Sequence, residues 1–73
     1  MIEHSYVTGR DFDPDDACYY VNIVQSAFMI DNGAVLLDLF VRGDGKLVFV
    51  FSKDDHRRIS PIWRVQKYGG DYS

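Results

Sequence analysis

Cysteine is almost absent from this chain, and its scarcity excludes several small-protein architectures. Among the 73 residues there is one cysteine, Cys18, so no internal disulfide can form and a four-cysteine zinc site is excluded. A lone cysteine in an apolar stretch is most often a buried, unreactive thiol, and we expect this of Cys18. Because disulfides are rare in reducing compartments, the composition favours a cytoplasmic protein.

Long hydrophobic runs are also missing. The N-terminal residues carry no signal-peptide pattern. The longest apolar run is far shorter than the roughly 20 residues that a membrane-spanning helix needs. We therefore expect no association with a membrane.

The common catalytic patterns are missing as well. The glycines at Gly43-Asp44-Gly45 join two apolar runs rather than a strand and a helix, so they do not form a phosphate-binding loop. No nucleophile elbow is present. The two histidines, His4 and His56, lie at no metal-ligand spacing. We expect no cofactor, no metal and no enzymatic activity; a small enzyme using His56 with Asp54 or Asp55 is the least favoured alternative.

One acidic stretch resembles half of a calcium-binding loop. Aspartates alternate there, but the glycine and glutamate required at the sixth and twelfth positions are replaced by Asp16 and Asn22. The start of a helix explains the stretch better, because Asp13 can cap and Pro14 fits the first helical position.

Acidic residues exceed basic ones, which gives a net charge of −3. This balance argues against a dedicated nucleic-acid-binding domain. The early acidic cluster is a candidate partner-binding surface: Asp11, Asp13, Asp15 and Asp16. The late basic cluster, close to Trp63 and Tyr68, is the alternative candidate, a nucleic-acid patch: Arg57, Arg58, Arg64 and Lys67.

Residues 34–52 predict a β-hairpin, around which the rest of the chain is expected to pack. Two runs rich in Val, Leu and Phe flank the turn at Asp44 and Gly45. A three-residue loop would pair Arg42 with Lys46 and give the better separation of polar and apolar side chains. Gly45 would then take a positive φ angle.

The hairpin has two apolar faces in this register. The first includes Leu37, Leu39 and Phe51. The second face is more apolar than a solvated face should be, and it carries Leu36, Phe40, Val48 and Val50. We expect these four residues to form a protein interface unless Ile62 and Trp63 cover them.

Two helices are expected around the hairpin. The first should run over residues 14–30 and end at Asn32-Gly33. The last should lie within residues 56–68, either as one bent helix or as a helix that begins at Pro61 after a Ser60 cap. Residues 2–8 alternate weakly and predict a short edge strand.

The order of these features resembles a family of short bacterial and phage domains of unknown function. The resemblance lies in an extended start with Thr and Asp, a helix with Ala and aromatic residues, a Phe-x-Phe strand and a closing helix with Tyr and Gly. The matching residues are Thr8, Asp11, Ala17, Tyr20, Gly33, Phe49, Phe51, Tyr68 and Gly69. The resemblance implies a small α+β domain without a known activity, and it transfers no functional residues.

We therefore expect residues 1–73 to form one α+β domain of β-α-β-β-α order, with a three-stranded, mainly antiparallel sheet packed against the helices. The expected function is that of a non-enzymatic protein-protein interaction module. We expect it to be a homodimer from a phage or mobile element and to inhibit a host factor through its acidic surface. The alternative is a nucleic-acid-binding accessory protein that uses the basic cluster.

Overall fold

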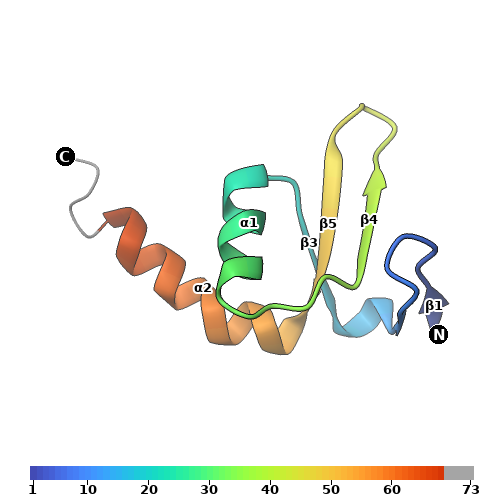
Figure 1. Ribbon diagram of the computed structural model, residues 1–73, viewed down its shortest axis with the longest axis horizontal. Helices are drawn as coiled ribbons and strands as arrows, with labels where there is room; N and C mark the ends of the chain where they lie inside the picture. Colours follow the sequence, from blue (N-terminus) through green and yellow to red (C-terminus); the bar gives the residue numbers. More distant parts are fainter. Residues whose placement is uncertain (69–73) are drawn as a thin grey trace.

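The computed structural model describes the backbone of residues 1–68 and the side chains of residues 1–63. It shows a small α+β fold with two helices, a two-stranded antiparallel sheet and a three-stranded antiparallel sheet (Figure 1). In chain order the elements are β1 (Glu3–His4), β2 (Asp11–Phe12), a 3₁₀ turn (Pro14–Asp16), β3 (Ala17–Tyr20), α1 (Ile23–Asp31), β4 (Asp38–Val41), β5 (Leu47–Ser52) and α2 (Lys53–Tyr68).

The predicted hairpin and its register are confirmed. Val41 pairs with Leu47 across the antiparallel β4–β5 ladder. The Arg42 N–H donates to the Lys46 carbonyl at 2.8 Å, as a three-residue loop requires. Gly45 has a φ angle of 85°, a conformation that glycine adopts without strain.

The prediction of one helix over residues 14–30 is wrong. Asp13 does cap a turn, because its side chain accepts a hydrogen bond from the Asp15 N–H, but the helix that follows is a single 3₁₀ turn. The chain then extends as β3, which pairs with β5. The expected β-α-β-β-α order is therefore not confirmed, and the third strand of the main sheet is β3 instead of residues 2–8.

A second cap explains where the first true helix begins. The Asn22 side chain accepts a hydrogen bond from the Gln25 N–H at 3.0 Å and so starts α1 at Ile23. The residues before Asn22 are aromatic or β-branched and fit a strand better than a helix. The helix ends as expected, since Gly33 takes a φ angle of 94° just after it.

The helices cover one face of the three-stranded sheet. The main core on this side comprises Tyr20, Met29, Ala34, Phe51 and Ile59. α2 runs without a break past Pro61, which supports the single-helix alternative, and it begins at Lys53 rather than at residue 56. Ser52 caps its start, because the Ser52 hydroxyl accepts the Asp55 N–H at 3.0 Å.

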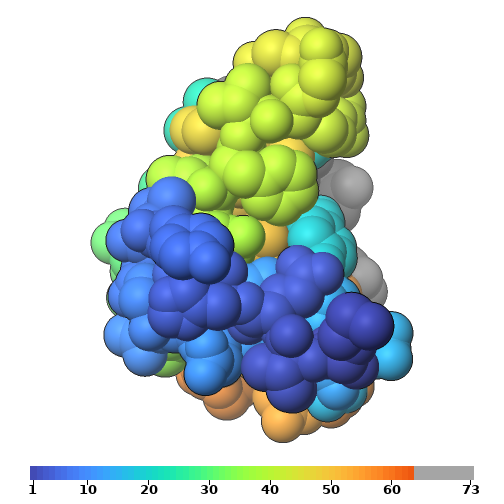
Figure 2. Space-filling view, turned by 90° about the vertical axis from the view of Figure 1, so that its right-hand side faces the viewer, coloured from blue at the N-terminus to red at the C-terminus, as the bar shows by residue number. Residues whose placement is uncertain are grey.

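The N-terminal segment covers part of the opposite face. Phe12 packs with Ala17 and Val50 in a second buried cluster, and Leu37 packs against it. Figure 2 shows this segment, in blue, lying below the yellow-green hairpin. β1 and β2 form their own small sheet, so the expected single sheet is not confirmed.

Candidate protein-binding site

Within residues 1–68, β3 is an edge strand whose outer side has no partner strand. The strand order is β3-β5-β4, so β3 pairs on one side only. In an antiparallel ladder, residues alternate between those whose backbone groups face the partner and those whose groups face away. The Arg42–Lys46 hydrogen bond sets this alternation for the whole sheet.

The alternation identifies which backbone groups of β3 are free. Counting along β5 from Lys46, the backbone groups of Phe49 and Phe51 face β3, where they pair with Tyr20 and Cys18. The backbone of Tyr19, between Cys18 and Tyr20, must therefore face outward. The same count directs the Ala17 and Val21 backbones outward.

One of these outward groups has a local partner. The Ala17 N–H donates to the Pro14 carbonyl at the end of the 3₁₀ turn. No backbone hydrogen bond beyond the strand ladders involves Tyr19 or Val21 in the described part of the chain. The Ala17 carbonyl, both backbone groups of Tyr19 and the Val21 N–H thus have no hydrogen-bond partner among the described residues.

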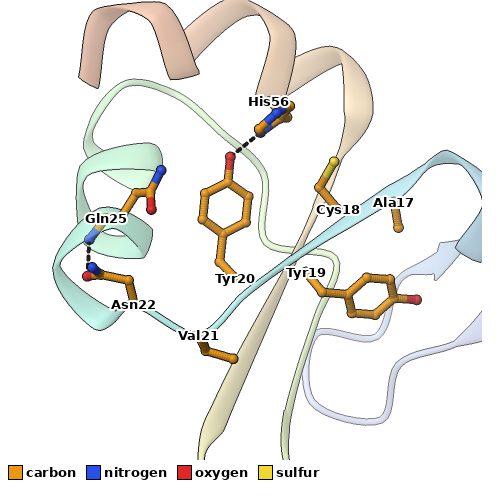
Figure 3. Close-up of a pocket in the computed structure, with 8 residues that line it drawn as sticks. All are labelled: Ala17, Cys18, Tyr19, Tyr20, Val21, Asn22, Gln25 and His56. Atoms are coloured by element: carbon orange, nitrogen blue, oxygen red, sulfur yellow. Dashed lines mark hydrogen bonds between the residues drawn. The ribbon is translucent and has the colours of Figure 1, made fainter. Parts of the chain in front are cut away.

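A hollow of about 590 Å³ lies along this edge. It is lined by Ala17, Cys18, Tyr19, Tyr20, Val21, Asn22, Gln25 and His56. Figure 3 shows that the Tyr20 ring points towards α2, while the Tyr19 ring points away from α2, towards the N-terminal segment. The hollow therefore brings together β3, the start of α1 and the first turn of α2.

A hydrogen bond between two aromatic side chains fixes the floor of the hollow. The Tyr20 hydroxyl and His56 Nδ1 are bonded, and the two rings meet edge to face with centroids 5.7 Å apart. Burial raises the pKa of the Tyr20 hydroxyl, with a further increase from the nearby Cys18. The hydroxyl therefore stays protonated at neutral pH, and when it donates to Nδ1, His56 carries its own proton on Nε2.

Tyr19 also lines the hollow, but its ring lies on the other face of β3 and is half exposed. Its ring meets that of Phe40 in an edge-to-face pair with centroids 6.4 Å apart. Desolvation raises the pKa of Tyr19, and the negative charges of Glu3, Asp38 and Asp15 raise it further. The Tyr19 side of the hollow is therefore electrically negative.

The predicted acidic cluster is divided between structural and solvent-exposed roles. Asp11 bonds the His4 ring at 2.7 Å, and Asp13 caps the 3₁₀ turn. Asp15 and Asp16 are exposed. Asp15 is the member of this cluster that contributes to the negative field at Tyr19.

The four apolar residues proposed for the second hairpin face do not share one surface. Val48 and Val50 are 2% and 0% exposed, which leaves them no side-chain surface for a partner. Phe40 is 40% exposed beside Tyr19. Leu36 packs against the helix-side core instead.

A local irregularity explains the position of Leu36. The Leu37 N–H donates to the Val50 carbonyl, although Asp38 is the residue paired with Val50. Two residues thus oppose one, as in a β-bulge, and the strict alternation of side chains fails before Asp38.

The predicted basic patch is partly neutralised by its own helix. Arg57 pairs with Asp54, and Arg58 pairs with Asp55 at 2.8 Å. Trp63 packs on Phe28, with ring centroids 5.2 Å apart, and does not cover the second face of the hairpin. The side chains of Arg64 and Lys67 lie outside the described residues, so this part of the prediction is not placed.

Several other kinds of site find no support in the described residues. No three His, Cys, Asp or Glu side chains among them gather closely enough to hold a metal ion. No helix in the described range combines the length and apolar character needed to cross a bilayer. Comparison with known proteins gave no match to a family model, to a curated protein or to a solved structure.

Proposed function

We propose that this chain is a non-enzymatic protein-interaction module that binds an extended segment of another protein along the outer edge of β3. The observation that supports the proposal is the row of open backbone groups on Ala17, Tyr19 and Val21 beside a hollow. An exposed strand edge of this kind is a template for a further strand.

The chemistry of strand addition fits the hollow. The main-chain hydrogen bonds would supply much of the affinity, and the side chains that alternate along the added strand would supply specificity. Cys18 and Tyr20 face one side of β3, whereas Tyr19 faces the other. A bound segment would therefore present its alternate side chains to two different surfaces.

Self-association is a further part of the proposal. α1 exposes apolar side chains of Ile23, Val24 and Ile30, which are 62%, 67% and 44% exposed. A helix that is apolar on nearly all sides is more typical of a buried position. Light scattering on a size-exclusion column at micromolar concentration tests this homodimer, and a clean monomer would remove it.

The narrower expectations remain predictions. Inhibition of a host factor, an origin in a phage or mobile element and a cytoplasmic location rest on the sequence alone. Nucleic-acid binding is the weaker alternative, because Arg57 and Arg58 are each paired with a carboxylate of their own helix.

One substitution tests strand addition without disturbing the rest of the sheet. Tyr19→Pro removes the outward N–H while leaving the β3–β5 ladder in place, since proline is tolerated on the free side of an edge strand. Tyr19→Val is the matched control, because it also removes the ring but keeps the N–H. A random library of displayed peptides, selected on the original protein, supplies the ligands.

We expect the selected peptides to bind the Tyr19→Val variant and to lose at least about tenfold in affinity for Tyr19→Pro, because the added strand loses a main-chain hydrogen bond and the ring of proline obstructs its approach. Val41→Pro, the corresponding change on the outer side of β4, should leave binding intact. Peptides that bind Tyr19→Pro as tightly as Tyr19→Val, or a failure to select any, would overturn the proposal.

A further inference from the structure

We propose that the segment bound along β3 is a basic one, in which lysine or arginine side chains alternate with apolar side chains. This inference rests on the proposed function and names the chemistry of its partner. The basic side chains would lie on the Tyr19 side of the sheet, and the apolar ones would enter the hollow between β3 and the helices.

The helix side of the hollow is suited to apolar side chains. Cys18 and Tyr20 face it from β3, and the Tyr20 hydroxyl and His56 Nδ1 are bonded to each other, which leaves Nε2 as the other polar atom of the His56 ring. Gln25 and Asn22 supply polar groups only at the α1 end, where the Asn22 side chain is already bonded to the Gln25 N–H. Little remains on this side to satisfy a buried charge, so an apolar side chain is favoured.

The Tyr19 side has the opposite character. Tyr19 and Asp38 both pair with Val50 across the sheet, so their side chains leave the same face. Glu3 pairs with Phe12, which packs with Ala17 and Val50 at this face. The charges of Glu3, Asp15 and Asp38 all raise the pKa of the Tyr19 phenol. These three carboxylates belong to β1, the 3₁₀ turn and β4, so three separate elements contribute negative charge to this face. A lysine or arginine leaving the added strand on this side would reach that negative field, and a glutamate would be repelled.

Two of the basic residues lie close to the Ala17 end of β3 and do not reverse this picture. Lys53 and Arg57 lie with Asp16 and Asp54 around a smaller hollow at the start of α2. Two positive and two negative groups balance there, and Arg57 is paired directly with Asp54. This smaller hollow therefore adds no net charge to the edge of β3.

The spacing of a β-strand matches the two surfaces. Side chains two residues apart lie on the same face and are separated by about 6.5–7 Å. The open groups from Ala17 to Val21 span five residues of β3, so a bound segment of five residues would place two or three side chains on each face. A strictly alternating basic-apolar pentamer is thus the simplest matching sequence.

Three blocked peptides test the inference: Lys-Val-Lys-Val-Lys, Gln-Val-Gln-Val-Gln and Glu-Val-Glu-Val-Glu. At a low salt concentration of about 20 mM, where surface charges are weakly screened, we expect the lysine peptide to bind about tenfold tighter than the glutamine peptide, because each exposed ion pair contributes only a few-fold. The glutamate peptide should bind most weakly. The advantage of lysine should shrink as salt is added.

Charge-removing variants locate the effect. In the double variant Glu3→Gln and Asp15→Asn, the difference between the lysine and glutamine peptides should fall to about twofold or threefold. Asp38 is left in place because it accepts a hydrogen bond from the buried Ser5 hydroxyl. Asp31→Asn is the control, since Asp31 does not contribute to the field at Tyr19 and its loss should leave the difference unchanged.

The possible failures are distinguishable. Equal binding of all three peptides, lost in each case with Tyr19→Pro, would overturn the basic partner and leave strand addition standing. Equal binding to Tyr19→Pro and Tyr19→Val, or no binding of any peptide, would overturn strand addition and the basic partner together. A lysine preference that persists in the double variant would overturn the assignment to the Tyr19 side.

Discussion

The two edges of the three-stranded sheet differ in the hydrogen bonds that they make with the rest of the chain. On the β4 edge, the Thr8 hydroxyl donates to the Leu37 carbonyl at 2.8 Å, and Asp38 accepts from both the Ser5 hydroxyl and the Leu39 N–H. On the β3 edge, the backbone groups of Tyr19 face a hollow instead.

Exposed strand edges promote unwanted pairing, and proteins usually block them with covering segments, charges or bulges. The N-terminal segment does this for the start of β4, with a bulge opposite Val50 and a buried Ser5 as its anchor. The start of β4 is thus blocked by specific hydrogen bonds, whereas no such bonds cover Tyr19 of β3 within the described residues. This difference supports a binding role for β3.

The largest expected effect tests which backbone groups of β3 face outward. Cys18→Pro removes an N–H from the β3–β5 ladder and leaves the Phe51 carbonyl without its partner, so we expect a loss of about 3 kcal/mol in the free energy of unfolding. Cys18→Ala is the control for the side chain. Tyr19→Pro, one residue later, should cost less than about 1 kcal/mol relative to Tyr19→Val. Urea unfolding followed by circular dichroism measures all four variants.

The reverse ranking, with Tyr19→Pro the more damaging of the two prolines, would contradict the assignment of the open groups. In that case the ladder would be shifted by one residue, and the Cys18 and Tyr20 backbones would face the hollow.

The next effect tests the blocked edge. Asp38→Ala removes the acceptor for the Ser5 hydroxyl, which is 1% exposed, and for the Leu39 N–H. An unpaired buried hydroxyl makes the loss about 2 kcal/mol. Asp38→Asn keeps an acceptor oxygen and should recover about half of it. Amide exchange at Leu39 should accelerate in Asp38→Ala, and an unchanged rate would show that this edge is protected in another way.

The sequence allowed the hairpin half of the fold to be predicted because its signals are local and agree with one another. The turn glycine, the apolar alternation and the pairing of Arg42 with Lys46 all favour one register, which the structure confirms. The end of α1 at Gly33 is equally local. The general class, α+β with antiparallel strands, followed from these elements.

The candidate site could not be predicted because residues 17–22 were assigned to a helix. Two cap residues occur in series, Asp13 and Asn22, and the local pattern does not show that Asp13 begins only a single 3₁₀ turn. The aromatic pair Tyr19-Tyr20 before Asn22 was the available signal for a strand. The Tyr20–His56 contact joins residues 36 positions apart, which no local pattern reveals.

The stability of the segment that leads into β4 is expected to depend on pH through Asp55. Asp55 of α2 accepts the Val35 N–H at 3.0 Å and pairs with Arg58. Burial favours the neutral carboxyl, but the hydrogen bonds from Val35 and Arg58 outweigh it and lower the pKa of Asp55. Since the folded-state pKa is below the unfolded value of about 3.9, this stabilisation is present above about pH 4 and is lost as the pH falls through the lower folded-state pKa.

The variant Asp55→Asn should therefore lose about 1.5 kcal/mol at neutral pH and show a flatter decline in stability below about pH 4. Asp54→Asn, which removes a more exposed charge one residue away, is the control for the loss of one negative charge. Equal acid slopes for Asp55→Asn and the original chain would contradict the role given to the Val35 and Arg58 contacts.

The smallest effect is expected on the open side. Tyr20→Phe removes only the hydroxyl that bonds His56 and keeps the edge-to-face contact with Phe51, so we expect the free energy of unfolding to fall by about 0.5–1 kcal/mol.

The contribution of Tyr20 to stability depends on pH because its folded-state pKa is raised. The contribution is complete below about pH 10, the unfolded value, and declines as the pH rises through the folded-state pKa. The variant should therefore lose less stability than the original chain between about pH 9 and pH 11. Tyr6→Phe, a change on an exposed ring, is the control. If Tyr20→Phe lowered the free energy of unfolding as much as Asp38→Ala, side-chain contacts would stabilise the β3 side as strongly as the β4 edge. The two edges would then differ only in their backbone hydrogen bonds.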